Sequence, residues 1–427
     1  MLETLKNAWK IVDLRKKILF TLFIILIFRI GSVIPVPFID PEALKTTVAE
    51  GTNTFMTLYS ALSGGALQYG TIFAMGVTPY INSSIIMQLL TVAIPYLERL
   101  SKEGEEGHKK IAKYTRFVTV ILGLIQGIAY FIYLSNNNCL SVSSTGARWF
   151  AGIVSVLTLT AGSALVMWLG EQIDEKGIGN GISMLLFAGI LSRAKDAFVQ
   201  LYYWFDGGAQ IAVIALILVF LAIIGFIVWM TNAERRLPVQ YAKRVVGRKM
   251  YGGQSSHIPI KVNMSGVMPI IFASSILMIP TMFLSFWGNS EHWFHKILEM
   301  FSTQGVFYAV LYFAMIIAFA YFYVTIQYNP VEMANNLRKN SGSIPGIRPG
   351  QPTSDFIKKV LSRITLIGAL FLSVIAVGPI IFGLLNETFR NVSLGGTSVL
   401  IIVGVALEVV SNLESQMMMR HYKGFLD

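Results

Sequence analysis

Long apolar runs separated by shorter polar segments organise the whole chain. A membrane-spanning helix needs about 20 mostly apolar residues, whereas a strand of a membrane barrel shows about ten residues of alternating polarity. Because the runs are continuous and of helical length, they predict an all-α polytopic membrane protein. Ten transmembrane helices are expected, at residues 18–34, 72–97, 117–135, 150–170, 178–194, 210–231, 266–287, 306–328, 364–385 and 395–413.

One apolar stretch does not fit this series. Residues 57–70 are apolar enough to leave water, but they are too short and too rich in glycine to span a bilayer. Gly64 and Gly65 would interrupt a helix there. Backbone that is not helical survives at membrane depth where it is buried in protein or lines a cavity. We therefore expect a short re-entrant segment, with a loop lying on the membrane surface as the alternative.

The distribution of positive charge predicts the topology. Of the 34 lysine and arginine residues, 27 fall in the N-terminal segment, the alternate loops and the tail that would share one side of the membrane. Such an excess marks the cytoplasmic side, so both termini are expected there. Two of these loops, 232–265 and 329–363, are long, basic and rich in turn residues, which is typical of binding loops. Anionic lipid, acidic protein or RNA would suit their charge.

Composition narrows the class of function. Hydrophobic residues make up 54% of the chain and charged residues 13%, and the mean hydropathy is +0.62. The single cysteine, Cys139, excludes a disulfide framework and a multi-cysteine metal site. The spans show neither the midplane charge cluster of a coupled transporter nor the paired serine and histidine of a hydrolase. We expect a protein that is not an enzyme and has no cofactor or bound metal.

The spans group as five plus five. The N-terminal half would comprise residues 1–195 and the C-terminal half residues 210–427, joined by an outer loop at 196–209. Five is odd, so the two halves would be inverted with respect to each other, as in many transporters. A secondary transporter of a small solute is therefore the alternative function, although the sequence shows no solute site.

Ordered motifs along nearly the whole chain resemble those of bacterial SecY, the family of central pore subunits of the Sec protein translocase. The motifs are IPVP at 34–37, SGGAL at 63–67, PYINSSIIMQLL at 79–90, EGEEGHKKIAKYTR at 103–116, WLGEQI at 168–173, GIGNGIS at 177–183, QSSHIPIKVN at 254–263, FASSI at 272–276, GIRPG at 346–350 and GGTSVLI at 395–401.

The resemblance implies a protein-conducting channel of the bacterial inner membrane. Such a channel translocates unfolded secretory polypeptides and releases membrane segments laterally into lipid. The implied partners are the SecE and SecG subunits, the SecA motor ATPase, the ribosome, polypeptides that carry signal sequences, and membrane lipid.

The resemblance also assigns residues to four sites, by motif position. The aliphatic pore ring is implied at Ile81, Ile85, Leu186, Ile271 and Ile401, where Leu186 replaces the more usual isoleucine. The plug that closes the outer funnel covers about residues 57–71 and includes Leu62, Ser63, Gly64, Gly65, Ala66 and Leu67. The polar seam of the lateral gate, between spans two, three, seven and eight, is implied at Asn82, Ser83, Gln126, Ser274 and Gln327. Contacts with SecA or the ribosome are implied at Arg236, Lys243 and Arg348.

Overall fold

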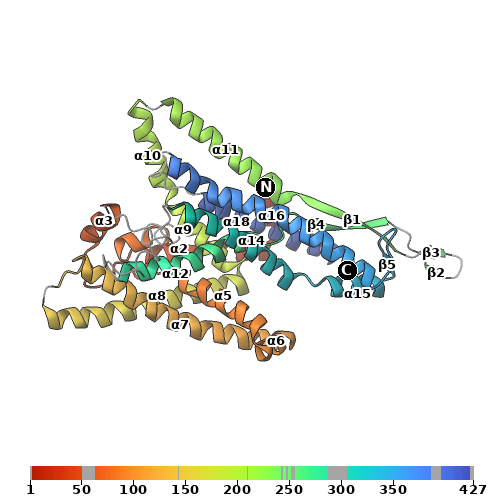
Figure 1. The fold of residues 1–427 in the computed structure, drawn as a ribbon, viewed down its shortest axis with the longest axis horizontal. Coiled ribbons are helices and arrows are strands. Elements are labelled where there is room, and N and C mark those ends of the chain that lie inside the picture. Colours follow the sequence, from red (N-terminus) through yellow and green to blue (C-terminus); the bar gives the residue numbers. More distant parts are fainter. Residues whose placement is uncertain are drawn as a thin grey trace.

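Helices dominate the structure, a computed structural model, and most of them run along its long axis (Figure 1). The β-strands gather at one end, which we call the strand end. The opposite end holds α3 (Pro41–Glu50) and the connection between α7 (Glu105–Asn136) and α8 (Thr145–Lys176). The described residues are 2–50, 63–142, 144–208, 210–241, 244–246, 249–251, 255–286, 305–385 and 396–423.

The other elements follow one another along the chain. Those of the N-terminal half are α1 (Leu2–Lys10), α2 (Val12–Gly31), the 3-10 helix η1 (Ala66–Tyr69), α5 (Thr78–Ala93), α6 (Pro95–Lys102), α9 (Gly181–Ser192) and α10 (Ala194–Asp206). The helices of the C-terminal half are α11 (Gln210–Asn232), α12 (Met268–Phe286), α14 (Val306–Gln327), α15 (Pro330–Lys339), α16 (Gln351–Leu385) and α18 (Gly396–Lys423). Its strands are β1 (Glu234–Tyr241), β2 (Arg244–Val246), β3 (Lys249–Tyr251), β4 (Ser255–Lys261) and β5 (Gly342–Ser343).

Every predicted span falls on a helix. Within the described residues, six helices are long and apolar enough to cross a membrane, namely α7, α8, α11, α14, α16 and α18. The bent pair of α5 and α6 makes a seventh if the two count as one span. Helix α9 has only 12 residues, fewer than the about 20 that a helix needs to cross a membrane. The mostly helical membrane fold is therefore confirmed, while the count of ten crossings stays a prediction.

The second predicted span, 72–97, is wrong at both ends. Helix α5 begins only at Thr78, and it ends at Ala93 because Ile94 adopts extended backbone (φ −106°, ψ 115°) ahead of Pro95. A proline clashes with a helical residue before it, whereas its own fixed φ suits the first position of a new helix. Helix α6 therefore leaves α5 at an angle of 100°.

The connection between the halves also differs from the prediction. Residues 196–209 were expected to form a loop, but most of them belong to α10, and the helix ends only before Gly207. The sequence AKDAFVQLYYWFD contains no glycine or proline that would interrupt a helix. The chain thus passes from one half to the other through a helix that packs on α9 and α11.

The two halves meet on two sides of the largest apolar core. On one side α12 packs against α5 and α7, and on the other α9 packs against α18. The core between them draws buried side chains from both halves, including α2, α8, α14 and α16. A second apolar cluster lies around η1 and α3, and a third lies beneath β1 at the strand end. The antiparallel pairing of β1 with β4 and with β5 covers this third cluster.

Candidate functional site

The fold brings the five predicted ring residues into one apolar cluster. They come from α5, α9, α12 and α18, and therefore from both halves of the chain. None of them exposes more than 5% of its surface, and they are Ile81, Ile85, Leu186, Ile271 and Ile401. The two α5 members are four residues apart, so they share one face of that helix.

Polar groups at the start of α9 fix the position of Leu186. The side-chain oxygen of Asn180 accepts a hydrogen bond from the backbone nitrogen of Ser183 at 3.0 Å, which caps the helix. The carboxylate of Asp174, near the end of α8, accepts one from the backbone nitrogen of Gly181 at 2.7 Å. A Cβ on Gly181 would collide with a carbonyl oxygen of α8, so only glycine allows this approach. The GIGNGIS motif therefore sets the depth of α9 in the bundle.

Aliphatic side chains at such a junction offer no specific polar contact. A narrow aliphatic passage excludes water and ions when it is empty, and its flexible side chains can close around an extended chain of any sequence. Among the described residues, no three His, Cys, Asp or Glu side chains come together in a way that could hold a metal ion. The arrangement suits a seal better than a solute-binding or catalytic site.

The predicted plug lies near α3, away from the strand end. Leu62 lies outside the described residues. Ser63, Ala66 and Leu67 are each no more than 2% exposed, and Leu67 belongs to the second apolar cluster. Gly64 and Gly65 have positive φ values of 66° and 87°. Neither glycine is helical, as the sequence predicts.

Two hydrogen bonds and a close backbone approach hold this segment against its own half. The hydroxyl of Tyr130 in α7 donates a hydrogen bond to the carbonyl oxygen of Leu67 at 2.9 Å. The hydroxyl of Ser192, at the end of α9, shares its one proton between the carbonyl oxygen of Gly64 at 3.2 Å and that of Gly189 in its own helix at 2.6 Å, so the bond to Gly64 is the weaker one. A Cβ on Gly64 would lie 2.5 Å from the carbonyl oxygen of Gly189 in α9. The segment is thus bound to the helix that carries a ring residue.

Sequence reasoning missed these supporting residues. A tyrosine in an apolar helix was the one signal, because a buried tyrosine hydroxyl usually finds a hydrogen-bond partner. That signal identifies Tyr130 as a residue with a partner but does not identify Leu67 as the partner.

Of the predicted gate residues, Ser83 is bonded within its own half and Gln327 is exposed. Ser83 is fully buried, and its hydroxyl donates a hydrogen bond of 2.6 Å to the carbonyl oxygen of Thr115 in α7. This bond joins two helices of the same half. Gln327 is the last residue of α14 and is exposed.

The other three lie on α5, α7 and α12, where the halves meet, as Ser83 does on α5. Asn82 in α5 and Gln126 in α7 are 8% and 9% exposed. Ser274 in α12 is half-buried and donates a hydrogen bond to the carbonyl oxygen of Ile271 in its own helix at 3.0 Å. Since α12 packs against both α5 and α7, the three helices that carry these side chains meet between the halves.

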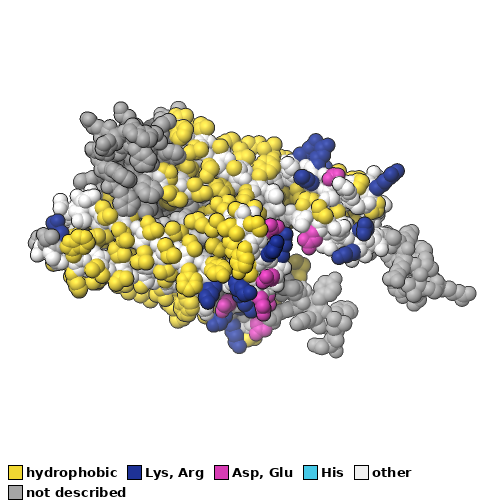
Figure 2. All heavy atoms as spheres, turned by 60° about the horizontal axis from the view of Figure 1, so that its bottom comes forward, with side chains coloured by type: hydrophobic (Ala, Val, Ile, Leu, Met, Phe, Trp, Pro, Cys, Tyr) yellow, Lys and Arg dark blue, Asp and Glu magenta, His cyan; other side chains and the backbone are white. Residues whose placement is uncertain are grey.

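Charged side chains gather on the right half of the visible face, at the strand end and at its lower middle, and a wide apolar surface covers the left and the middle (Figure 2). Arg236 in β1 is exposed, and its Nε lies 2.7 Å from Oε1 of Glu234. Arg348 is exposed in the turn after β5, where Gly346 and Gly350 have positive φ. This turn lies in the loop 329–363, which the sequence predicts to be rich in turn residues. Lys243 lies outside the described residues.

The antiparallel ribbon that carries Arg236 was not foreseen. Residues 232–265 were expected to form a basic loop, whereas β1 and β4 pair from Glu234 with Lys261 to Gln240 with Ser255. Burial alternates along β1, and Leu237 and Val239 point into the third apolar cluster. This period of two is the signal of a half-buried strand.

Comparison with known proteins gives a consistent result. The SecY family model matches residues 71–410. The protein translocase subunit SecY of Streptomyces coelicolor is 43% identical over 438 residues, with 100% of both chains covered.

Solved channel structures share the fold. One is a SecY structure whose plug domain stabilises the closed translocation channel and maintains a membrane seal. Its TM-score is 0.64 and its sequence identity is 17%, and the match covers 94% of this chain and 92% of the SecY chain in that structure. Sec61 in the canine ribosome–channel complex has a TM-score of 0.58 and 16% identity, with the same coverage.

Proposed function

Because this chain belongs to the SecY family and is the protein-conducting channel subunit of a translocase, we propose that unfolded secretory polypeptides cross it through the aliphatic ring. The chain is a multi-pass membrane protein, and as a channel subunit it is not itself an enzyme. One observation carries the proposal: five side chains from both halves are buried in one apolar cluster. The small-solute transporter finds no support, since the full-length relative is a translocase subunit.

The chemistry of the ring suits a substrate of variable sequence. A passing polypeptide presents every kind of side chain, so a passage that relied on specific polar contacts would accept some segments and hold others. Aliphatic groups make weak, non-directional contacts that re-form around each new residue. When no chain is present, the same groups meet and keep the passage dry.

Ion conductance of the empty channel tests the ring. Ile85→Ser makes the cluster polar at one point, and Ile86→Ser makes the same change at the next residue of α5, which is not a member of the cluster. We expect the first variant alone to raise the resting conductance in planar bilayers, because a hydroxyl favours wetting. Equal conductance in both variants and the unaltered chain would contradict the ring.

The segment at about residues 57–71 acts as the plug. Its support is the burial of Ser63, Ala66 and Leu67 and the hydrogen bonds that tie Leu67 to α7 and Gly64 to α9. A plug held mainly by its own half can leave its seat without separating the halves. We expect it to seal the outer funnel at rest and to move aside when a polypeptide enters.

The lateral gate opens between α5 and α7 on one side and α12 and α14 on the other. Its support is the packing of α12 on α5 and α7. Asn82, Gln126 and Ser274 are the candidates for its polar seam. The bond of Ser83 to Thr115 supports a packing role for that side chain within the N-terminal half. The halves at 1–195 and 210–427 would hinge at α10.

The chain lies in the bacterial inner membrane with both termini and the strand end in the cytoplasm. The concentration of charge at the strand end supports this orientation. Arg236, Lys243 and Arg348 are proposed to contact the SecA motor ATPase or the ribosome. SecE and SecG are the expected companion subunits, polypeptides with signal sequences are the expected substrates, and membrane lipid receives the released segments.

A further inference from the structure

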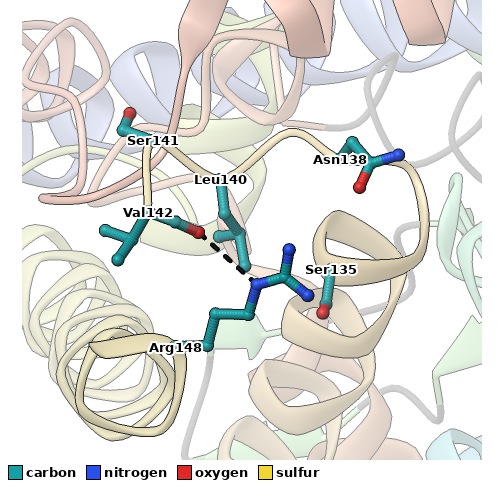
Figure 3. Close-up of a pocket in the computed structure, with 6 residues that line it drawn as sticks. All are labelled: Ser135, Asn138, Leu140, Ser141, Val142 and Arg148. Carbon is teal, nitrogen blue, oxygen red and sulfur yellow. Dashed lines mark hydrogen bonds between the residues drawn. The ribbon is translucent and has the colours of Figure 1, made fainter. Parts of the chain in front are cut away.

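A small cavity of about 180 Å³ lies between the end of α7 and the start of α8, at the end of the molecule opposite the strands (Figure 3). The guanidinium group of Arg148 points into it, towards Ser135 (Figure 3). The lining consists of Ser135, Asn138, Leu140, Ser141, Val142 and Arg148. The function proposed above uses none of these residues.

Arg148 is an unusual residue in this region. It is the only charged residue in the sequence between Arg116 and Glu171. Among the described residues it has no acidic partner within ion-pair distance, and its one hydrogen bond runs from Nε to the carbonyl oxygen of Val142 at 3.5 Å. The remaining guanidinium donors are free for a ligand.

The neighbouring polar groups are also available. Within the described part of the chain, the side chains of Ser135, Asn138 and Ser141 form no hydrogen bond. The carboxylate of Asp40, whose backbone pairs with that of Cys139 beside the cavity, already accepts hydrogen bonds from two backbone nitrogens at the start of α3. The cavity therefore joins one cation and several unused donors, without a carboxylate to neutralise them.

The surface beside the cavity is apolar. Trp149 and Phe150 follow Arg148 and expose 74% and 60% of their surfaces, and Ile153, one turn further along α8, exposes 59%. On α7, Ile132 exposes 36%. Tryptophan beside arginine at the end of a spanning helix is typical of the membrane–water interface. A ligand in this cavity would hold its polar part against Arg148 and its apolar part against these side chains.

We infer that this cavity binds the phosphate group of an anionic phospholipid in the outer leaflet, with Arg148 as the main ligand. An arginine presents a planar fork of donors that matches two phosphate oxygens. Ser135, Ser141 and Asn138 would donate to the remaining oxygens or to a hydroxyl-bearing headgroup. The acyl chains would lie along the exposed side chains of α7 and α8.

Native mass spectrometry of the full-length chain tests the inference. The protein is purified in detergent with equal parts of phosphatidylglycerol and phosphatidylcholine, and the retained lipids are counted and titrated. We expect the unaltered chain to retain one phosphatidylglycerol more than Arg148→Gln, with an affinity at least about tenfold higher. Arg363→Gln, which removes an exposed arginine from α16, should behave like the unaltered chain.

A second cavity variant and a competition with inorganic phosphate complete the experiment. Ser135→Leu fills the cavity from its other wall and keeps the charge, so it should also lose the lipid. Inorganic phosphate at millimolar concentration should not displace the lipid, because it lacks the acyl chains. Retention unchanged by both cavity variants, or equal retention of phosphatidylcholine, would overturn the site. Binding of inorganic phosphate alone that depends on Arg148 and excludes lipid would show a free-anion site instead.

Discussion

The hydroxyl of Tyr130 in α7 donates a buried hydrogen bond of 2.9 Å to the carbonyl oxygen of Leu67 in η1. This single contact ties the segment proposed as the plug to a helix that also packs on α5 and α12. Because the bond is shielded from water, the Leu67 carbonyl has no solvent partner to replace it while the segment stays seated.

We predict that Tyr130→Phe loosens the plug. Loss of the hydroxyl leaves the buried Leu67 carbonyl with only its bond from the backbone nitrogen of Gly70, which costs about 0.5–1.5 kcal/mol. The seated state should become less populated, so the empty channel should conduct more ions in planar bilayers. Tyr321→Phe is the matched control, because it removes a tyrosine-to-carbonyl bond of 3.1 Å to Ser362, between α14 and α16. A conductance that rises equally in both variants would count against the role of Tyr130.

Gly64→Ala should disturb the same segment for a different reason. Gly64 and Gly65 both have positive φ, so an alanine at either position carries a backbone strain of about 1–2 kcal/mol. Only at Gly64 would the new Cβ also meet backbone, 2.5 Å from the carbonyl oxygen of Gly189, whereas nothing lies within 4 Å at Gly65. We expect resting conductance to rise more in Gly64→Ala than in Gly65→Ala. The reverse order would refute close seating on α9.

Ser83→Ala distinguishes packing from gating. The buried bond of 2.6 Å to Thr115 joins α5 to α7, so its loss should lower the free energy of unfolding by about 1 kcal/mol. Thermal unfolding in detergent measures this change. Ser84→Ala, one residue along, breaks only a 3.3 Å bond from Gln88 and should have a smaller effect. A Ser83 variant of unchanged stability that translocates precursors with defective signal sequences would place the residue in the gate.

Arg348→Ala should weaken binding at the strand end. Arg348 is exposed and, among the described residues, lacks an acidic partner, whereas Arg236 is paired with Glu234. We expect roughly three- to tenfold weaker binding of SecA or of ribosomes at low salt, and a smaller difference as salt screens the charge. Lys113→Ala removes an exposed charge from α7 and should change binding less. Sedimentation with liposomes that contain the channel measures both variants.

The sequence predicted those parts of the fold that depend on local composition. Apolar runs located a helix at each expected span, and the Gly64–Gly65 pair indicated a break in helix. Helix ends were less predictable, because helices continue beyond the membrane where their sequence allows it. Helix α16 begins at Gln351, well before the apolar run at 364, and α5 ends early because of Pro95.

The candidate site depended more on contacts between distant segments. Motif positions named the ring residues, but the burial of Ile271 and Ile401 with Ile85 in one cluster follows from packing between halves. No local pattern joins Tyr130 to Leu67 or Ser192 to Gly64. The β1–β4 ribbon was missed because its period of two is short and lies among glycine and charge.

The most direct test of the pore is a disulfide between the ring and a polypeptide in transit. Cys139, the only cysteine, is buried and is first replaced by serine. Cysteine is then placed at Ile85, or at Ile86 as the control, and the chain is reconstituted with SecE and SecG. SecA, ATP and a stalled secretory precursor with its own cysteine complete the reaction.

The proposed path predicts a crosslink at Ile85 that requires ATP and a signal sequence, and little crosslinking at Ile86. Cysteines placed at Leu186, Ile271 and Ile401 should give crosslinks with the same requirement for ATP and a signal sequence. Assembled, folded channels that give no crosslink at any ring position while the precursor is still translocated would contradict the account, because the polypeptide would then cross elsewhere.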